Sequence, residues 1–397
     1  MAAPEIPPID PPARASFNAE QVARGAALSA IGNCADCHTV EGGKPFAGGR
    51  ALQTTFGTIY GTNITPDPDT GIGRWSLEAF TRALREGVDR RGEHLYPVFP
   101  YDHFTRLSDD DVAALYAFVM TRDPVRQPDR ANQVAFPYNV RDFIAVWKNL
   151  YFRPGRFVPD SQQSARWNQG AYLAEALGHC GACHTPRNAL GAEVQERHFA
   201  GGSAGSWHAP ALDRTSPSPA PWTVDELTVY LRTGLVERHA IAAGPMAPVV
   251  RNLERVDRDG VHAIAVYVAA GMQGAEAGPL RATQTAPAEA PGAAIYASTC
   301  GECHDQGRTT SSGGALELPL AIALSLPTPA NLIHITLQGI PPREGEASRI
   351  MPGFAGSLTD AQVVSLLRYL RGDVAHKPPW TDLDSQVQAI GREGPGD

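Results

Sequence analysis

A five-residue pattern, Cys-x-x-Cys-His, occurs three times in this chain and uses all six of its cysteines. Two thiols three positions apart can each bond to a porphyrin, and the imidazole that follows can bind the iron. The pattern is the attachment signature of a c-type haem, and three copies in one chain make chance a poor explanation. The three copies are Cys34, Cys37 and His38; Cys180, Cys183 and His184; and Cys300, Cys303 and His304.

Two other uses of paired cysteines fit this pattern less well. A zinc site would combine two Cys-x-x-Cys elements for each metal, and a redox dithiol does not need a histidine directly after it in every copy. No cysteine is left over for a disulfide, so covalent haem would supply the crosslinks that disulfides give other exported domains. We therefore predict three haem c groups, each with one iron, in a chain that works outside the cytoplasmic membrane.

Charge and motif content limit the function further. The formal net charge is −8, which is not the basic balance of a nucleic-acid-binding protein. The sequence has no Gly-rich nucleotide loop between a strand and a helix, and no convincing pair of nucleophile and base. We therefore expect conduction of electrons rather than catalysis.

The surroundings of the three motifs repeat, which predicts the fold. Each motif follows a helix and precedes two more, with long loops and almost no alternating strand pattern. We predict an all-α fold of three tandem class I-like cytochrome c domains, each with one covalently bound haem c. The predicted segments are a Pro-rich arm at 1–15, domains at 16–158, 159–274 and 292–397, and a linker at 275–291.

A glycine precedes the first cysteine of each copy by eight to ten residues, at Gly25, Gly170 and Gly292. Such a small residue allows two helices to cross closely. We expect the partner to be the last helix of each repeat, at 108–121, about 260–270, and 359–371. The aromatic residues that would pack on the leading helices are Tyr116, Phe118, Tyr267 and Tyr369.

The middle helices, at 75–86, 222–233 and 328–338, each end at a glycine suited to a C-cap: Gly87, Gly234 and Gly339. Thr223 and Glu226 form a capping-box pattern at the start of the second. Met246 and Met351 each follow their glycine by twelve residues, in Pro-containing segments. A thioether is the sixth ligand of a His/Met cytochrome, so we predict that both bind iron.

The first repeat departs from this rule, because Phe99 stands twelve residues after Gly87. Phenylalanine cannot bind iron. We predict that His103, four residues further on, takes the place of the thioether and gives a bis-histidine haem. His94 and Met120 are weaker candidates, and a five-coordinate iron is the remaining alternative.

Several further runs resemble the cytochrome c subunits of bacterial membrane-bound alcohol, gluconate, fructose and aldehyde dehydrogenases. These runs are Gly-Thr-Ile-Tyr-Gly-Thr-Asn-Ile-Thr-Pro-Asp at 57–67, Gly-Ile-Gly-Arg-Trp-Ser at 71–76, Arg-Ala-Leu-Arg-Glu-Gly-Val at 82–88 and Tyr-Asn-Val-Arg at 138–141. The resemblance spans nearly the whole chain. It implies a periplasmic, membrane-associated subunit that takes electrons from a catalytic dehydrogenase and passes them to ubiquinone or a terminal oxidase.

The first repeat also bears on the identity of the partner. Many members of this family carry methionine where this chain has Phe99. The Phe-Pro-Tyr-Asp-His-Phe form at 99–104 looks more like the cytochromes that accompany molybdopterin and iron–sulfur enzymes, which oxidise aldehydes or N-heterocycles. A flavin or pyrroloquinoline quinone (PQQ) dehydrogenase is the alternative partner. Because no stretch has the length of a membrane span, we expect any membrane anchor to lie outside this chain.

Two competing functions make different predictions. A haem enzyme or ligand sensor of the peroxidase type would use an open first iron, with His94 or His103 as the acid–base group. The reduced protein would then bind carbon monoxide rapidly, whereas three six-coordinate haems would not. A freely diffusing shuttle would form no stable complex, and single-haem shuttles need far fewer residues.

Overall fold

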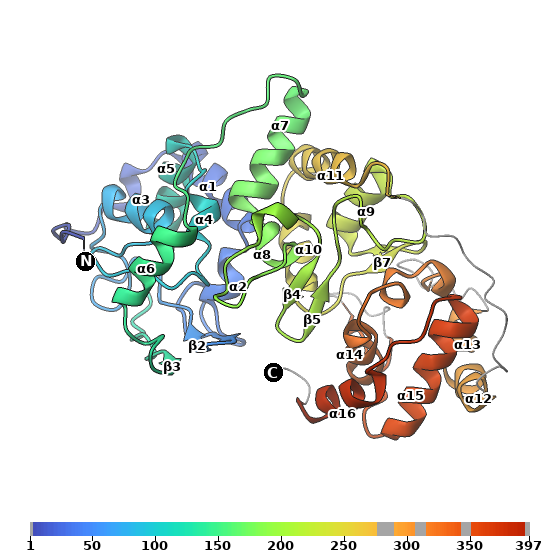
Figure 1. Cartoon of the computed structure of the whole chain (residues 1–397). Helices are drawn as coiled ribbons and strands as arrows, with labels where there is room; N and C mark the ends of the chain where they lie inside the picture. Colours follow the sequence, from blue (N-terminus) through green and yellow to red (C-terminus); the bar gives the residue numbers. More distant parts are fainter. Residues whose placement is uncertain (1–2, 276–289, 306–314, 343–350, 394–397) are drawn as a thin grey trace. The chain divides into compact units, whose positions relative to one another are not determined.

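The computed structural model describes residues 3–275, 290–305, 315–342 and 351–393 (Figure 1). The predicted linker at 275–291 therefore lies almost wholly outside the described residues. The described chain is mainly helical, as predicted, but it also contains three small antiparallel sheets. Within the described ranges, no helix has both the length and the apolar character needed to cross a bilayer.

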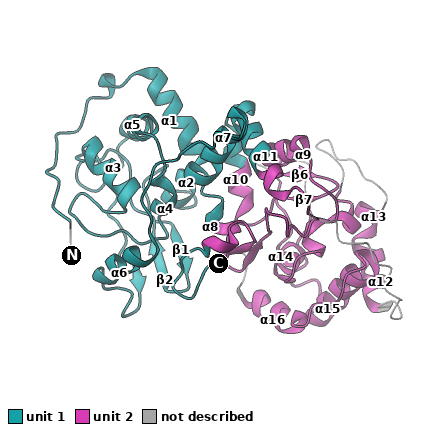
Figure 2. Cartoon of the chain, turned by 45° about the horizontal axis from the view of Figure 1, so that its top comes forward, with its two compact units in different colours: residues 1–182, 187–194, 251–267 teal, residues 183–186, 195–250, 268–397 magenta. Residues whose placement is uncertain are grey.

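The chain forms two compact units (Figure 2). Unit 1 comprises residues 1–182, 187–194 and 251–267, and unit 2 comprises residues 183–186, 195–250 and 268–397. The first haem motif lies in unit 1 and the third in unit 2. The boundary falls inside the second motif, between Ala182 and Cys183. The division into three cytochrome domains stays a prediction.

Unit 1 contains the first repeat and the leading helix of the second. Its three-stranded sheet has the order β1-β2-β3, and Leu52 pairs with Ile59 in the first hairpin. Its elements are η1 Arg14–Ser16, α1 Ala19–Ile31, α2 Cys34–His38, β1 Ala51–Thr54, β2 Gly57–Tyr60, α3 Leu77–Glu86, α4 Tyr101–Phe104, α5 Asp109–Met120, β3 Gln133–Val134, α6 Asp142–Tyr151, α7 Ala165–Tyr172 and the π-helical turn η2 Leu173–Leu177.

Unit 2 contains most of the remaining elements, including a core of α12, α14, α15 and α16 around Ile333, Leu367 and Val387. Its elements are η3 Gln195–Arg197, β4 Gly202–Ala204, β5 Trp207–Ala209, α9 Val224–Thr233, β6 Leu235–Val236, β7 Ala240–Ile241, α12 Ala290–Thr299, α13 Gly301–His304, η4 Leu318–Leu320, η5 Ile322–Leu324, α14 Ala330–Gln338, α15 Asp360–Tyr369, η6 Leu370–Val374 and α16 Leu383–Glu393. Three helices contain residues of both units: α8 Gly181–His184, α10 Met246–Glu254 and α11 Arg258–Met272.

The predicted close helix crossing is confirmed in all three repeats. A Cβ atom added to the glycine of the leading helix would lie far inside the contact distance of a main-chain oxygen on the last helix. The next side-chain neighbours are the Cβ atoms of Phe118, Tyr267 and Tyr369, as predicted. The distance from the added Cβ atom to the main-chain oxygen would be 2.0 Å for Gly25 and Ala114, 1.9 Å for Gly170 and Ala263, and 2.2 Å for Gly292 and Ser365.

The predicted caps of the middle helices are also present. Each of these helices ends at its expected glycine with a positive φ, at 59°, 74° and 72° for α3, α9 and α14. The capping box of Thr223 and Glu226 is formed at the start of α9. All three helices begin two residues later than predicted, because the residue before each helix acts as its N-cap; in α3 and α9 this residue is extended.

The Pro-rich arm lies along unit 1 itself and has no helix or strand over residues 3–13. The main-chain nitrogens of Ile6 and Ile9 donate to the carbonyl oxygens of Arg90 and Arg74, at 2.9 and 3.0 Å. The Arg90 guanidinium also pairs with Glu5 at 3.0 Å. These contacts fix the arm to the first repeat.

Candidate haem-attachment sites

Each motif histidine lies at the end of a short helix and has the same main-chain partner. Its Nδ1 lies close to a carbonyl oxygen, which can only accept a hydrogen bond, so Nδ1 carries the proton and donates it. Nε2 is then the unprotonated nitrogen that can bind a metal. The pairs are His38 with Thr62 at 2.7 Å, His184 with Pro210 at 2.7 Å and His304 with Leu316 at 3.3 Å.

The carbonyls of Thr62, Pro210 and Leu316 are functional groups that the sequence reasoning missed. They follow their histidines by 24, 26 and 12 residues. The similar separations in the first two repeats could have indicated these carbonyls from the sequence. The third repeat has a shorter loop and would not have matched. A main-chain acceptor also leaves no trace in residue type, which is why motif reading passes over it.

Burial sets the protonation of several groups at these sites. It lowers the pKa of His38 and of His184, although the carbonyl partners oppose this effect, and so keeps both imidazoles neutral. Burial raises the pKa of the Cys34 thiol and, together with the nearby Cys303 and Asp305, raises the pKa of Cys300 to about 11. None of the six cysteines, all of which lie in the described ranges, forms a disulfide.

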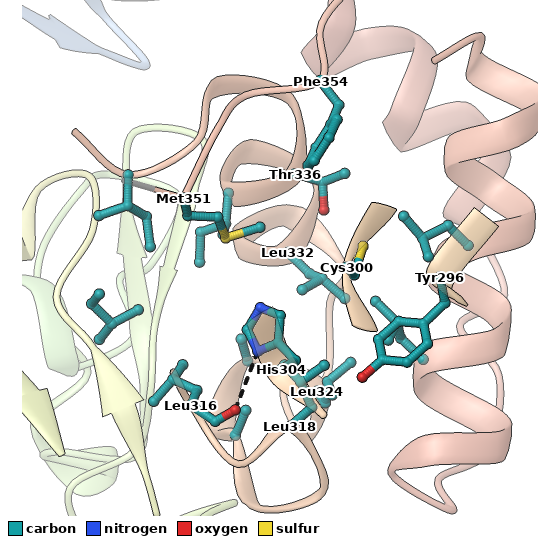
Figure 3. Close-up of a pocket in the computed structure, with 17 residues that line it drawn as sticks. Tyr296, Cys300, His304, Leu316, Leu318, Leu324, Leu332, Thr336, Met351 and Phe354 are labelled. Carbon is teal, nitrogen blue, oxygen red and sulfur yellow. Dashed lines mark hydrogen bonds between the residues drawn. The ribbon is translucent and has the colours of Figure 1, made fainter. Parts of the chain in front are cut away.

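The third repeat brings its predicted ligands together in one pocket. Figure 3 shows His304 and Met351 pointing into the same space, with Cys300 at its side. The pocket is lined mainly by apolar side chains, among them Leu316, Leu332 and Phe354. A pocket with apolar walls that holds an imidazole, a thioether and a thiol fits a covalently attached His/Met haem.

The predicted ligands of the second repeat are found on short helices. His184 ends α8, and the half-buried Met246 is the first residue of α10 rather than part of an irregular loop. The helix can start there because Pro248 falls in its first turn, where a proline's missing N–H is not needed. Ligation by Met246 stays a prediction.

In the first repeat, His103 lies on α4 and is buried. Its Nδ1 is 2.7 Å from the carbonyl oxygen of Glu175, and its Nε2 is 2.7 Å from Oε1 of Glu193. Burial alone would lower the pKa of His103, but the hydrogen bond to Glu193 and the charges of Asp102 and Glu193 outweigh it and raise the pKa to about 9. To bind iron, Nε2 would have to leave Glu193. Ligation by His103 stays a prediction with that requirement attached.

The remaining candidates of the first repeat have other partners. Nδ1 of His94 lies 3.1 Å from Nζ of Lys148. Met120 is 1% exposed and packs in a core cluster with Phe46 and Phe118, which is the ordinary role of a buried methionine. Phe99 makes an edge contact with Phe104, with the ring centroids 5.5 Å apart.

Two protein families match segments of this chain. The model for "Cytochrome c" matches residues 22–123, and the model for "Cytochrome C oxidase, cbb3-type, subunit III" matches residues 287–370. These matches cover the first and third motifs.

Several characterised proteins are similar over almost the whole chain. One subunit of the nicotinate dehydrogenase of Pseudomonas putida is 45% identical over 99% of this chain, which spans 33% of that protein. The fructose dehydrogenase cytochrome subunit of Gluconobacter japonicus is 34% identical over 97% of this chain and 86% of its own length. The gluconate 2-dehydrogenase cytochrome c subunit of Pantoea cypripedii is 36% identical over 88% of this chain and 85% of its own length.

Proposed function

We propose that this chain, which belongs to the family of cytochrome c subunits of dehydrogenase complexes, carries three haem c groups and passes electrons from a catalytic dehydrogenase subunit to ubiquinone or a terminal oxidase. The observation that carries the proposal is the apolar pocket of the third repeat, where His304 and Met351 face the same space beside Cys300. The same histidine-to-carbonyl hydrogen bond in the first two repeats extends it to all three motifs.

The proposed attachment and ligand sets follow the three motifs. The six cysteines bond to the haems, and the motif histidines are the proximal ligands. Met246 and Met351 are the sixth ligands of the second and third irons, and His103 is the proposed sixth ligand of the first. The proposed domains are residues 16–158, 159–274 and 292–397.

The bound haem supplies reversible one-electron exchange. The chain's own residues position it and set its potential. The carbonyls of Thr62, Pro210 and Leu316 hold each proximal imidazole in one tautomer and orientation. A methionine ligand and an apolar wall both raise the reduction potential, whereas a histidine in place of methionine lowers it. A dehydrogenase removes two electrons from its substrate, whereas each haem accepts only one. A series of haems can therefore take up the two electrons in turn.

The proposed partner is a molybdopterin enzyme with an iron–sulfur subunit that oxidises an N-heterocycle or an aldehyde. Two observations support this choice over a flavin or PQQ enzyme. The segment at 99–104 has the Phe-Pro-Tyr-Asp-His-Phe form, and the relative with 45% identity is named as a nicotinate dehydrogenase subunit. The sugar-acid and sugar dehydrogenase cytochromes reach 36% and 34%. We place the complex on the periplasmic side of the cytoplasmic membrane.

The test is reduction of the haems by substrate in the complex purified through a tag on this chain. Nicotinate or an aldehyde should reduce the haems, and a ubiquinone analogue should then reoxidise them. Both steps are followed by the haem absorption bands. Reduction by fructose, gluconate or ethanol alone would contradict the molybdopterin partner. Rapid binding of carbon monoxide by the dithionite-reduced protein would instead favour a haem enzyme or ligand sensor with an open first iron.

A further inference from the structure

Residues 136–158 expose an unusual amount of apolar surface. On α6, Phe143, Val146 and Leu150 are 51%, 54% and 53% exposed, and their spacing of three and seven residues places them on one face of the helix. At the two ends of the stretch, Phe136 and Val158 are 78% and 81% exposed. We call Phe143, Val146 and Leu150 the α6 apolar face; Phe136 and Val158 are the two most exposed of the large hydrophobic residues described.

The opposite side of α6 is firmly attached to unit 1. Ile144 is buried, and the ammonium group of the buried Lys148 donates to the carbonyl oxygens of Glu86 and Gly87, the latter at 2.8 Å. These carbonyls belong to the C-terminal end of α3, which favours a cation. Burial lowers the pKa of Lys148 to about 8.

On its outer side α6 therefore exposes apolar residues where an ordinary surface helix exposes polar ones, although its inner side buries Ile144 as well as Lys148. Because Lys148 fixes the inner side, the outward position of Phe143, Val146 and Leu150 is not a result of loose packing. Figures 1 and 2 place α6 at the outside of unit 1. An apolar face held outward in this way marks an interaction surface.

The charge of the stretch indicates what binds there. Residues 136–158 contain four basic residues and one acidic residue, a net charge of +3, in a chain whose net charge is −8. The guanidinium groups are already engaged: Arg141 donates to the carbonyl of His94, Arg153 to that of Leu150, and Arg156 to Asp109. Arg141 and Arg153, at the two ends of α6, donate to neutral carbonyls and keep their positive charge, whereas Arg156 pairs with Asp109 and Lys148 is buried on the inner side. Basic side chains beside an apolar face are typical of helices that lie in an anionic lipid surface.

We propose that the α6 apolar face inserts into the interfacial layer of an anionic phospholipid bilayer and holds unit 1 at the membrane. The inference deepens the membrane association that is part of the proposed function, because electrons bound for a lipid-soluble quinone must be delivered there. The helix lies in the plane of the membrane and does not cross it, since its ten residues extend only about 15 Å.

The test uses the full-length protein with its haems and sedimentation with vesicles. Wild-type protein should bind vesicles that contain phosphatidylglycerol, bind vesicles of phosphatidylcholine alone more weakly, and lose part of the difference in high salt. The variant F143S/V146S/L150S should partition at least about tenfold more weakly. Its haem absorption spectrum should stay that of wild type, which shows that it is folded.

The matched control replaces two other exposed apolar residues, Leu77 on α3 and Val229 on α9, which are 41% and 44% exposed. The variant L77S/V229S should bind vesicles like wild type. Equal binding by the F143S/V146S/L150S variant, or no vesicle binding by wild type, would overturn the proposal. Loss of the catalytic partner from that variant, with vesicle binding unchanged, would assign the face to a protein interface instead. A low haem count would contradict the proposed function but not this inference.

Discussion

At the motif histidines, residue type identifies the groups that can bond to the haem, and main-chain geometry orients the imidazole. The Cys-x-x-Cys-His pattern identifies the thiols and the imidazoles, because only those side chains can make the bonds. The acceptors at Thr62, Pro210 and Leu316 are main-chain oxygens, so no residue type marks them. Sequence reasoning could therefore name His38, but not the contact that orients it.

The proposed sixth ligand of the first haem is a single side chain, His103. Replacing His103 with alanine should convert one haem in three to a high-spin, five-coordinate form, because Phe99 offers no replacement ligand. The measurement is the absorption spectrum of the oxidised protein, with His376→Ala as the control, since His376 is exposed and belongs to no motif.

An unchanged spectrum in His103→Ala would remove His103 from the ligand set. His103 would then serve as the buried partner of Glu193 that the structure shows. The main-chain carbonyl of Glu175 and the carboxylate of Glu193 come from positions 72 and 90 residues further along the chain. Nothing in the local sequence of α4 indicates that they meet His103.

Among the elements, the helices were predictable and the short strands were not. Glycine recurrence identified the three crossings, glycine identified the ends of the middle helices, and the Thr223–Glu226 pattern identified the start of α9, because each rests on local backbone chemistry. The strands are two to four residues long and have too few positions to show an alternating pattern. The π-helical turns η2 and η6 also left no sequence signal that we could use.

The crossing of α12 with α15 gives a direct test at this scale. Gly292→Ala would place a Cβ atom 2.2 Å from the carbonyl oxygen of Ser365, so one helix must shift. Overpacking of this kind costs about 1–3 kcal/mol or more. We expect a melting temperature several degrees lower by circular dichroism.

Gly372→Ala is the matched control for that crossing, because a Cβ atom there would meet nothing within 4 Å. It should melt within about a degree of wild type. If the two variants melted at the same temperature, close packing at Gly292 would not be what holds α12 against α15.

For the whole molecule, the chain forms two compact units, although its haem motif occurs three times. The second motif is divided between the two units, and its repeat is divided with it. The leading helix α7 and the start of α11, which cross at Gly170 and Ala263, belong to unit 1, whereas residues 195–250 with Met246 belong to unit 2. The motifs indicate how many sites the chain has and where they lie in the sequence. They do not predict which distant segments pack together into a compact unit.

The central claim is that three haems are bonded to one polypeptide, and intact mass spectrometry of the mature protein tests it most directly. We expect the polypeptide mass plus three haems, resistant to acid–acetone extraction because thioether bonds hold them. The variant C300S/C303S should lose one haem and keep two. A mature wild-type protein that carries two haems or fewer would contradict the account.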